Sequence, residues 1–174
     1  MGFDKYDGKK EVRFGGSSKK FRPDPGKYEV EILDDIDKSF NEKSGNTSLV
    51  FNFRTVGFVG EQGDASNIGL TVRVWFPDNV GIAKDKLTAV IYAAGQVPYF
   101  RELYDEVPNM SDPNWPAFFK DIRDKLIFRR IGIEVQNRKG EKQEFTEVIS
   151  FFPIAQPKKT MVETDDNFAW PEQQ

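Results

Sequence analysis

Apolar and polar residues alternate along three stretches in the first half of the chain. Residues 27–33, 47–57 and 68–76 each show the period of two that is typical of a half-buried β-strand. Residues 34–38 would extend the first strand with more twist, and residues 39–46 are expected to form a turn. We therefore predict a meander of three antiparallel strands. Its inward side chains are Tyr28, Val30, Ile32, Leu49, Phe51, Phe53, Leu70, Val72, Val74 and Phe76.

The period changes after residue 76. Residues 83–94 place apolar side chains at helical spacing, and Gly95 follows as a C-terminal cap. A short helical piece is expected over residues 99–104. A further helix is expected from about Asn114, a candidate N-cap together with Ser111, to Lys125. The sequence thus predicts a helical insertion over residues 77–126, whose packed side chains are Leu87, Val90, Ile91, Ala94, Phe118, Phe119 and Ile122.

Two more strands are expected after the insertion. Residues 131–136 alternate with period two, and residues 137–142 (NRKGEK) have the composition of a turn. Residues 145–152 form the return strand, and Pro153 ends it because proline has no N–H for a sheet ladder. The predicted fold is all-β with a helical insertion: a five-stranded OB-fold-like barrel over residues 27–153, in the order β-β-β-α-β-β, closed by this hairpin.

Composition limits the chemistry. The chain of 174 residues has no His and no Cys, which excludes Ser-His-Asp and Cys-His catalysis, disulfides and nearly all zinc sites. Charged residues make up 30%, mean hydropathy is −0.59, and no apolar run approaches the roughly 20 residues of a membrane-spanning helix. We expect one domain in the cytoplasm, with no cofactor.

Charge is distributed unevenly. Residues 1–26 hold seven Lys and Arg against four Asp and Glu, residues 27–156 hold 16 against 20, and residues 157–174 hold two against four. We predict a flexible basic arm over residues 1–26 and a disordered acidic tail over residues 154–174. The arm is either a segment that follows a phosphate backbone or a solvated leader, and the sequence leaves both interpretations open.

The outward face of the second and third strands carries Asn52, Arg54, Arg73 and Trp75. Arginines beside an aromatic ring suit single-stranded nucleic acid, because guanidinium groups pair with phosphates and bases stack on rings. Cationic and aromatic residues in two turns would extend this face: Phe40, Lys43, Arg138, Lys139 and Lys142, with Arg129 and Arg130 as further candidates before the last hairpin. The alternative is ordinary packing, with Trp75 under the helical insertion and the arginines solvated.

Several segments of the chain form a recognisable series. They are PGKYEVEI at residues 25–32, KSGN at 43–46 followed by LVFNFRTV, then IGIEV and VISFFP near the end. Together they resemble a phage family of small single-stranded DNA-binding proteins encoded beside recombination and replication genes. The resemblance covers about residues 23–153. It implies an OB-like fold, single-stranded DNA as the ligand, and no catalytic residues. Homo-oligomerisation is left open.

The C-terminal segment is similar to the acidic tails with which bacterial and phage single-stranded DNA-binding proteins dock replication or recombination partners. Asp165, Asp166, Phe168 and Trp170, with Glu163, carry this similarity. The chain departs from the pattern because residues 171–174 (PEQQ) leave no apolar residue at the end. An unstructured terminus is the alternative.

Two rival functions are weighed. The net-acidic body favours a protein-interaction or virion-assembly β-domain that does not bind nucleic acid. Asp34, Asp35 and Asp37 would serve a carboxylate-dependent nuclease if they bound Mg²⁺. No general base or phosphate-cradling glycine loop accompanies these three residues. We therefore expect a non-catalytic protein.

Overall fold

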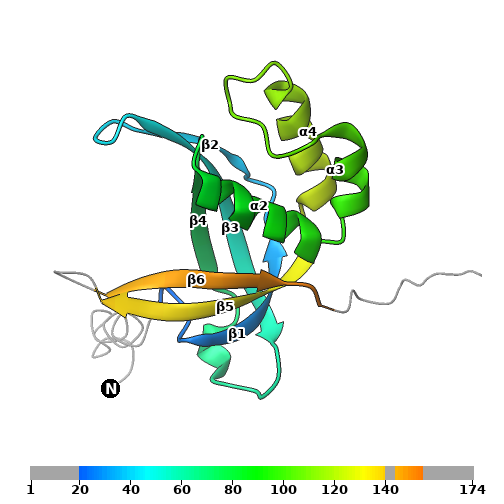
Figure 1. Cartoon of the computed structure of the whole chain (residues 1–174). Helices are drawn as coiled ribbons and strands as arrows, with labels where there is room; N and C mark the ends of the chain where they lie inside the picture. Colours follow the sequence, from blue (N-terminus) through cyan, green and yellow to red (C-terminus); the bar gives the residue numbers. More distant parts are fainter. Residues whose placement is uncertain (1–19, 140–143, 155–174) are drawn as a thin grey trace, which may run out of the picture.

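The computed structural model describes residues 20–139 and 144–154. It is mostly antiparallel sheet, with helices between the fourth and fifth strands (Figure 1). The elements are β1 (Gly26–Ile32), β2 (Asp37–Asn41), β3 (Asn46–Phe58), the 3-10 helix η1 (Ala65–Asn67), β4 (Thr71–Pro77), α2 (Gly81–Ala93), α3 (Val97–Leu103), α4 (Trp115–Leu126), β5 (Arg130–Lys139) and β6 (Glu144–Phe152).

The 13-residue strand β3 lies at the centre of the sheet. Its first half pairs with β2 and its second half with β1, while β4 runs along its other side. The predicted meander is therefore confirmed as β1, β3 and β4. β1 and β2 pair one after the other along the same side of β3 and are interrupted at residues 33–36. Beside this break, Leu33 N still donates a 3.0 Å hydrogen bond to Asn52 O.

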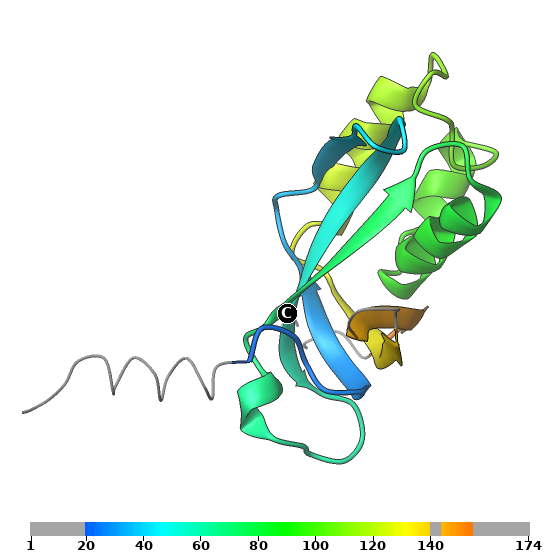
Figure 2. The same cartoon turned by 90° about the vertical axis from the view of Figure 1, so that its left-hand side faces the viewer.

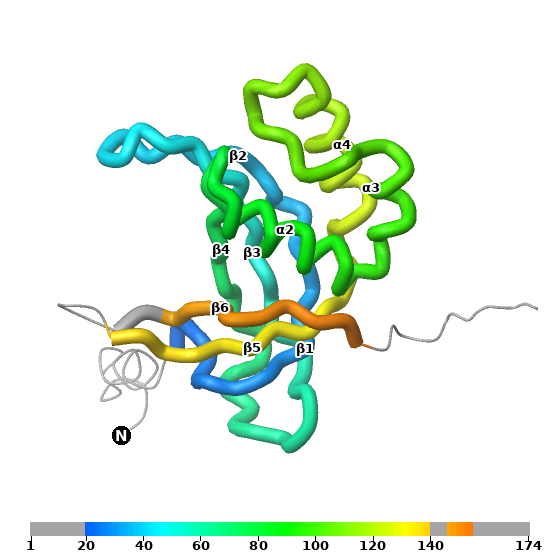
Figure 3. Tube along the Cα trace, in the orientation of Figure 1, coloured from blue at the N-terminus to red at the C-terminus, as the bar shows by residue number. Residues whose placement is uncertain are grey.

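Only the first two residues of β2, Asp37 and Lys38, were predicted as strand, and then as an extension of the first strand. Residues 39–46 were expected to form a turn, but the turn is confined to residues 42–45, where Gly45 has φ 72°. All five residues of β2 are exposed, so the segment carries no apolar alternation that sequence reasoning could detect. It is a strand because β3 extends past β1 and presents a free edge. The resulting β2–β3 hairpin projects from the body (Figure 3).

The sheet continues from β1 through β5 to β6, and the β5–β6 hairpin crosses β3 and β4 at a steep angle (Figure 1). In the part of the chain that the structure describes, β6 pairs with β5 alone and β4 with β3 alone. The prediction of a closed five-stranded barrel is therefore wrong in two respects: the sheet has six strands, and it is open between β4 and β6. Helix α2 packs against both of these strands (Figure 2).

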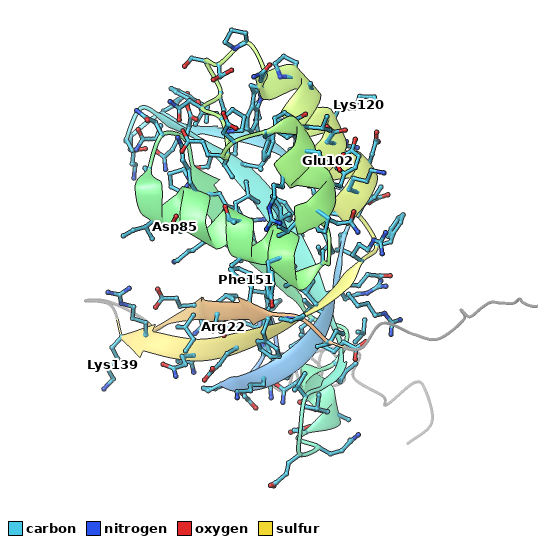
Figure 4. The ribbon with its side chains drawn as sticks, turned by 45° about the vertical axis from the view of Figure 1, so that its right-hand side comes forward. Arg22, Asp85, Glu102, Lys120, Lys139 and Phe151 are labelled. Carbon is cyan, nitrogen blue, oxygen red and sulfur yellow. The ribbon has the colours of Figure 1, made fainter. Side chains whose placement is uncertain are left out.

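Aromatic side chains fill the open side. The ring of Phe51 on β3 lies 5.3 Å from that of Phe76 on β4, and Phe76 lies 6.3 Å from Phe151 on β6. Phe53 completes the group at 5.7 Å from Phe151. Figure 4 shows Phe151 between α2 and the β5–β6 hairpin. The core is therefore continuous across the gap even though no backbone ladder closes it.

The helices follow the predicted stripes. Leu87, Val90, Ile91 and Ala94 are buried, and Gly95 has φ 75°, which confirms the C-terminal cap of α2. Asn114 is the N-cap residue of α4, although its side chain makes no capping bond. No helix among the described residues is long and apolar enough to cross a membrane.

A carboxylate holds α3 and α4 together. Asp121 accepts hydrogen bonds from the hydroxyls of Tyr99 at 2.9 Å and Tyr104 at 2.6 Å. The Lys125 ammonium lies 4.4 Å from the centroid of the Tyr99 ring. Burial, and then the bond to Asp121, raises the pKa of Tyr104; the same bond is the main cause that raises the pKa of Tyr99. The two phenols therefore stay neutral donors to higher pH than tyrosines in water.

Candidate nucleic-acid interface

Trp75 stands on the outer face of β4, opposite Val50 of β3. Its side chain is 54% exposed, so the helical insertion does not cover it. Val50, its partner across the strand pair, is 8% exposed. The backbone of Trp75 is thus fixed in the sheet, while much of its indole ring is exposed to solvent.

Arg73 and Asn52 lie opposite each other beside this tryptophan. The Arg73 Nε donates a 3.0 Å hydrogen bond to Asn52 Oδ1, and Asn52 Nδ2 donates a 2.8 Å bond to Asp35 Oδ2. The guanidinium carbon lies 6.0 Å from the centroid of the Trp75 ring, at the limit of a cation–π contact. Asn52 is only 5% exposed, so a buried amide orients an exposed cation against an exposed ring.

A surface hollow of about 410 Å³ brings Trp75 together with the β2–β3 hairpin. Phe40, whose side chain is 62% exposed, contributes to its lining. The remaining lining residues are uncharged: Ser39, Asn41, Ser44, Asn46, Ser48 and Pro77. A hollow that combines two exposed aromatic residues with amides and hydroxyls can stack a planar ring and hydrogen-bond its edge.

Lys43 occupies the turn that ends this hairpin. Asn41 Oδ1 shapes the turn by accepting bonds from Lys43 N at 2.9 Å and Ser44 N at 3.2 Å. Among the described residues the Lys43 ammonium makes no ion pair. The structure therefore brings Phe40 and Trp75 together in one hollow, with Arg73 beside Trp75 and Lys43 in the turn of the same hairpin.

Arg54 lies further along β3, where a carboxylate already neutralises it. Its Nη2 is 2.6 Å from Glu31 Oε1 on β1, and Arg130 Nη1 is 3.1 Å from Glu29 Oε2. These pairs span adjacent strands of the outer face. A phosphate that binds to Arg54 must displace or share an internal partner. This pairing could not be predicted, because Glu31 and Arg54 are 23 residues apart.

The β5–β6 hairpin carries the remaining predicted cations. Arg138 is paired with Glu147 at 3.3 Å, and Lys139 is exposed at the far end of β5 (Figure 4). The two hairpin ends project on the same side of the molecule but are separate (Figure 1). Arg138 and Lys139 are therefore not part of the group around Trp75, and Lys142 lies outside the described residues.

The last part of the predicted basic arm is anchored by Asn67, which sequence reasoning missed. Asn67 Oδ1 accepts bonds from Asp24 N at 2.9 Å and Lys20 Nζ at 3.2 Å, and Lys20 pairs with Asp24 at 2.9 Å. The contact with Lys20 is the main cause that lowers the pKa of the Asp24 carboxyl. No sequence pattern marks Asn67, because its role depends on a contact with Asp24, 43 residues away. The tail residues Asp165, Asp166, Phe168 and Trp170 lie outside the described residues.

The acidic residues proposed for Mg²⁺ do not converge. Asp35 accepts its bond from Asn52, and Asp37 Oδ1 accepts a 2.8 Å bond from Lys38 N. The strand that was needed to put both on one face is interrupted between β1 and β2. Within residues 20–139 and 144–154, no group of three acidic side chains is arranged to hold a metal ion.

Comparison with known proteins gives no relative: no family model matches the chain, and no curated protein is significantly similar to it.

Proposed function

We propose that this protein binds single-stranded DNA without catalysing a reaction, and that it serves phage DNA replication or recombination. The observation that carries the proposal is the grouping of Trp75, Phe40 and Arg73: two exposed aromatic residues line one hollow, and the guanidinium stands against the indole. The resemblance to phage single-stranded DNA-binding proteins points to the same ligand.

The chemistry of the hollow suits a base and its phosphate. An unstacked base gains about 1–3 kcal/mol from an aromatic platform, and this gain is largely independent of sequence because every base has a π-face. Arg73 lies beside the platform, where the phosphate of a stacked nucleotide would follow. Lys43 adds a second cation at the hairpin turn. Among the described residues, those that line this hollow include no carboxylate.

The proposal extends to the fold. The order of a meander, a helical segment and a hairpin that returns antiparallel to β1 is that of an OB-like domain. On this interpretation α2 and the phenylalanine rings occupy the side that a fifth ladder closes in a complete barrel. The outer face of β3 and β4, with the loops at its ends, then corresponds to the surface with which such domains bind oligonucleotides.

The experiment is a titration of intrinsic tryptophan fluorescence with oligo-dT across a series of salt concentrations. With Trp170→Phe as the common background, so that the tail adds no emission, we expect quenching that is lost in Trp75→Phe, because Trp115 is buried at 6% exposure and reports little on a surface ligand. The apparent affinity should fall with added salt. Absence of both quenching and salt-sensitive binding would sink the proposal. A gel shift with and without Mg²⁺ distinguishes binding from cleavage.

A protein-interaction or virion-assembly domain is the second candidate. The ion pairs of Arg54 with Glu31 and of Arg138 with Glu147 favour it, because they leave less positive charge for a polyanion. A stable complex of fixed stoichiometry with a protein, together with indifference to oligo-dT, would support this function over the first.

A further inference from the structure

Phe128 combines two unfavourable features in one residue. Its backbone has φ 64°, in the left-handed region that residues with a Cβ rarely adopt, and its side chain is 58% exposed. Among the described residues the only other non-glycine with positive φ is Asn79, an amino acid that tolerates this conformation. Such strain persists where surrounding structure fixes it, and it gathers at sites of function.

Three backbone hydrogen bonds hold Phe128 in this conformation. Phe128 N donates to Ile32 O at 2.6 Å, Ile32 N donates to Arg129 O at 2.9 Å, and Arg129 N donates to Leu126 O at 3.1 Å. They join the end of α4 to the last residue of β1. Glycine would fit this backbone without strain, and a polar residue would fit the exposed position better. These hydrogen bonds thus explain the backbone conformation of residue 128, but they do not explain why its side chain is aromatic.

A series of backbone pairings connects Phe128 to the candidate interface. Arg73 of β4 lies opposite Asn52 of β3, Asn52 O accepts a bond from Leu33 N, and the preceding residue, Ile32, accepts the bond from Phe128 N. Neighbouring strands are about 4.8 Å apart, so three such steps separate β4 from Phe128 by on the order of 15 Å. The backbones of Arg73 and Phe128 therefore lie toward opposite ends of one strip that crosses β4, β3 and β1.

We infer that Phe128 is a second base-stacking platform for single-stranded DNA, at the far side of this strip from Trp75. Arg129, the exposed neighbour of Phe128, supplies a cation for the phosphate that follows. This inference rests on the proposed function. It adds a binding residue that lies outside the strand faces and turns, at the junction of α4 and β5.

The test is Phe128→Gly, with Tyr92→Ala as the matched control, since Tyr92 is 60% exposed on α2, away from this strip. Affinity for oligo-dT is measured by anisotropy with oligonucleotides of about 4 to 16 nucleotides. We expect Phe128→Gly to weaken binding roughly 5- to 100-fold for the longer oligonucleotides, with less effect on the shortest, while the melting temperature stays level or rises. Tyr92→Ala should bind like the wild type.

The outcomes separate the inference from the function on which it rests. If the wild type binds and Trp75→Ala weakens binding, but Phe128→Gly binds like the wild type at every length, Phe128 is not a platform and the proposed function stands. If the wild type does not bind, both fail. Should Phe128→Gly lower the melting temperature, Phe128→Asn gives a second variant that accepts the backbone conformation. Unchanged affinity in a folded Phe128→Asn also overturns the inference.

Discussion

Arg73 depends on Asn52 for its position. The 3.0 Å bond from Arg73 Nε to Asn52 Oδ1 ties a solvent-facing guanidinium to a side chain that is 5% exposed. Because the other end of the amide is bonded to Asp35, neither the amide nor the cation is free to turn independently. The orientation of Arg73 beside Trp75 is thus set from within the sheet.

We expect Asn52→Ala to lower the free energy of unfolding by about 1–3 kcal/mol, since two hydrogen bonds of about 0.5–1.5 kcal/mol each are lost. DNA binding should weaken less than in Trp75→Ala, because Arg73 keeps its charge. Urea unfolding and a binding titration on the same variant measure the two effects. Wild-type stability would show that the amide does not hold the pair.

Trp75→Ala should reduce affinity for oligo-dT by about 1–3 kcal/mol, the value of one stacked base. Trp115→Phe is the fluorescence control, because that ring is buried among α4 residues and should alter stability rather than binding. Isothermal titration calorimetry avoids relying on tryptophan emission. Equal affinity of wild type and Trp75→Ala would move the binding site elsewhere.

Glu31→Gln should strengthen DNA binding, because it releases Arg54 from a 2.6 Å ion pair. The slope of log affinity against log salt should steepen by about 0.7, corresponding to one more phosphate on a single strand. The fold should lose no more than about 1 kcal/mol, as expected for an exposed pair. Glu147→Gln, which releases Arg138 on the separate hairpin, provides the comparison. An unchanged slope in Glu31→Gln would place Arg54 outside the site.

Asp121→Asn should make stability less sensitive to alkaline pH. The pKa values of Tyr99 and Tyr104 are raised in the folded protein above the ordinary value near 10, so their contribution is complete below pH 10 and is lost as pH rises beyond it. Removing the carboxylate reduces the shift, although burial of Tyr104 keeps part of it. Urea unfolding at about pH 8 and pH 11 in both proteins measures the difference. An identical loss in the two would contradict this origin.

Gly132→Ala should destabilise the β5–β6 hairpin by about 1–3 kcal/mol, because an added Cβ would collide with the ring of Phe152. The double variant Gly132→Ala/Phe152→Ala should recover part of that loss, since the obstructing ring is gone. A double-mutant cycle from urea unfolding isolates the coupling. Additive effects would mean that the ring moves aside freely.

Much of the fold could be predicted from alternation. The buried positions of β1, β3 and β4, and the stripe of α2, follow from apolar residues at periods of two and 3.6. β2 could not be found in this way, because its strand character comes from the edge of β3 and not from its own DKSFN sequence. The open side between β4 and β6 could not be predicted either, because it depends on where α2 packs.

For the candidate site, alternation predicted which side chains share a strand face but not which partners their charges have. Alternation placed Arg54, Arg73 and Trp75 on one face, and exposure of Trp75 agrees with that placement. The partners of the arginines come from distant segments: Glu31 for Arg54, and Asn52 for Arg73. The left-handed backbone conformation of Phe128 could not be predicted, because it depends on the junction of α4 with β1.

The pairing of β1 with β5 has a consequence for synthesis of the chain. Glu29 and Arg130, neighbours in this ladder, are 101 residues apart. A ribosome adding about 5–20 residues each second needs roughly 5–20 s to deliver β5 after β1. Throughout that interval one edge of β1 has no native partner, and β3 can protect only the other. The nascent protein therefore passes through a stage in which it can recruit a foreign strand, and its yield should depend on how quickly translation reaches the last hairpin.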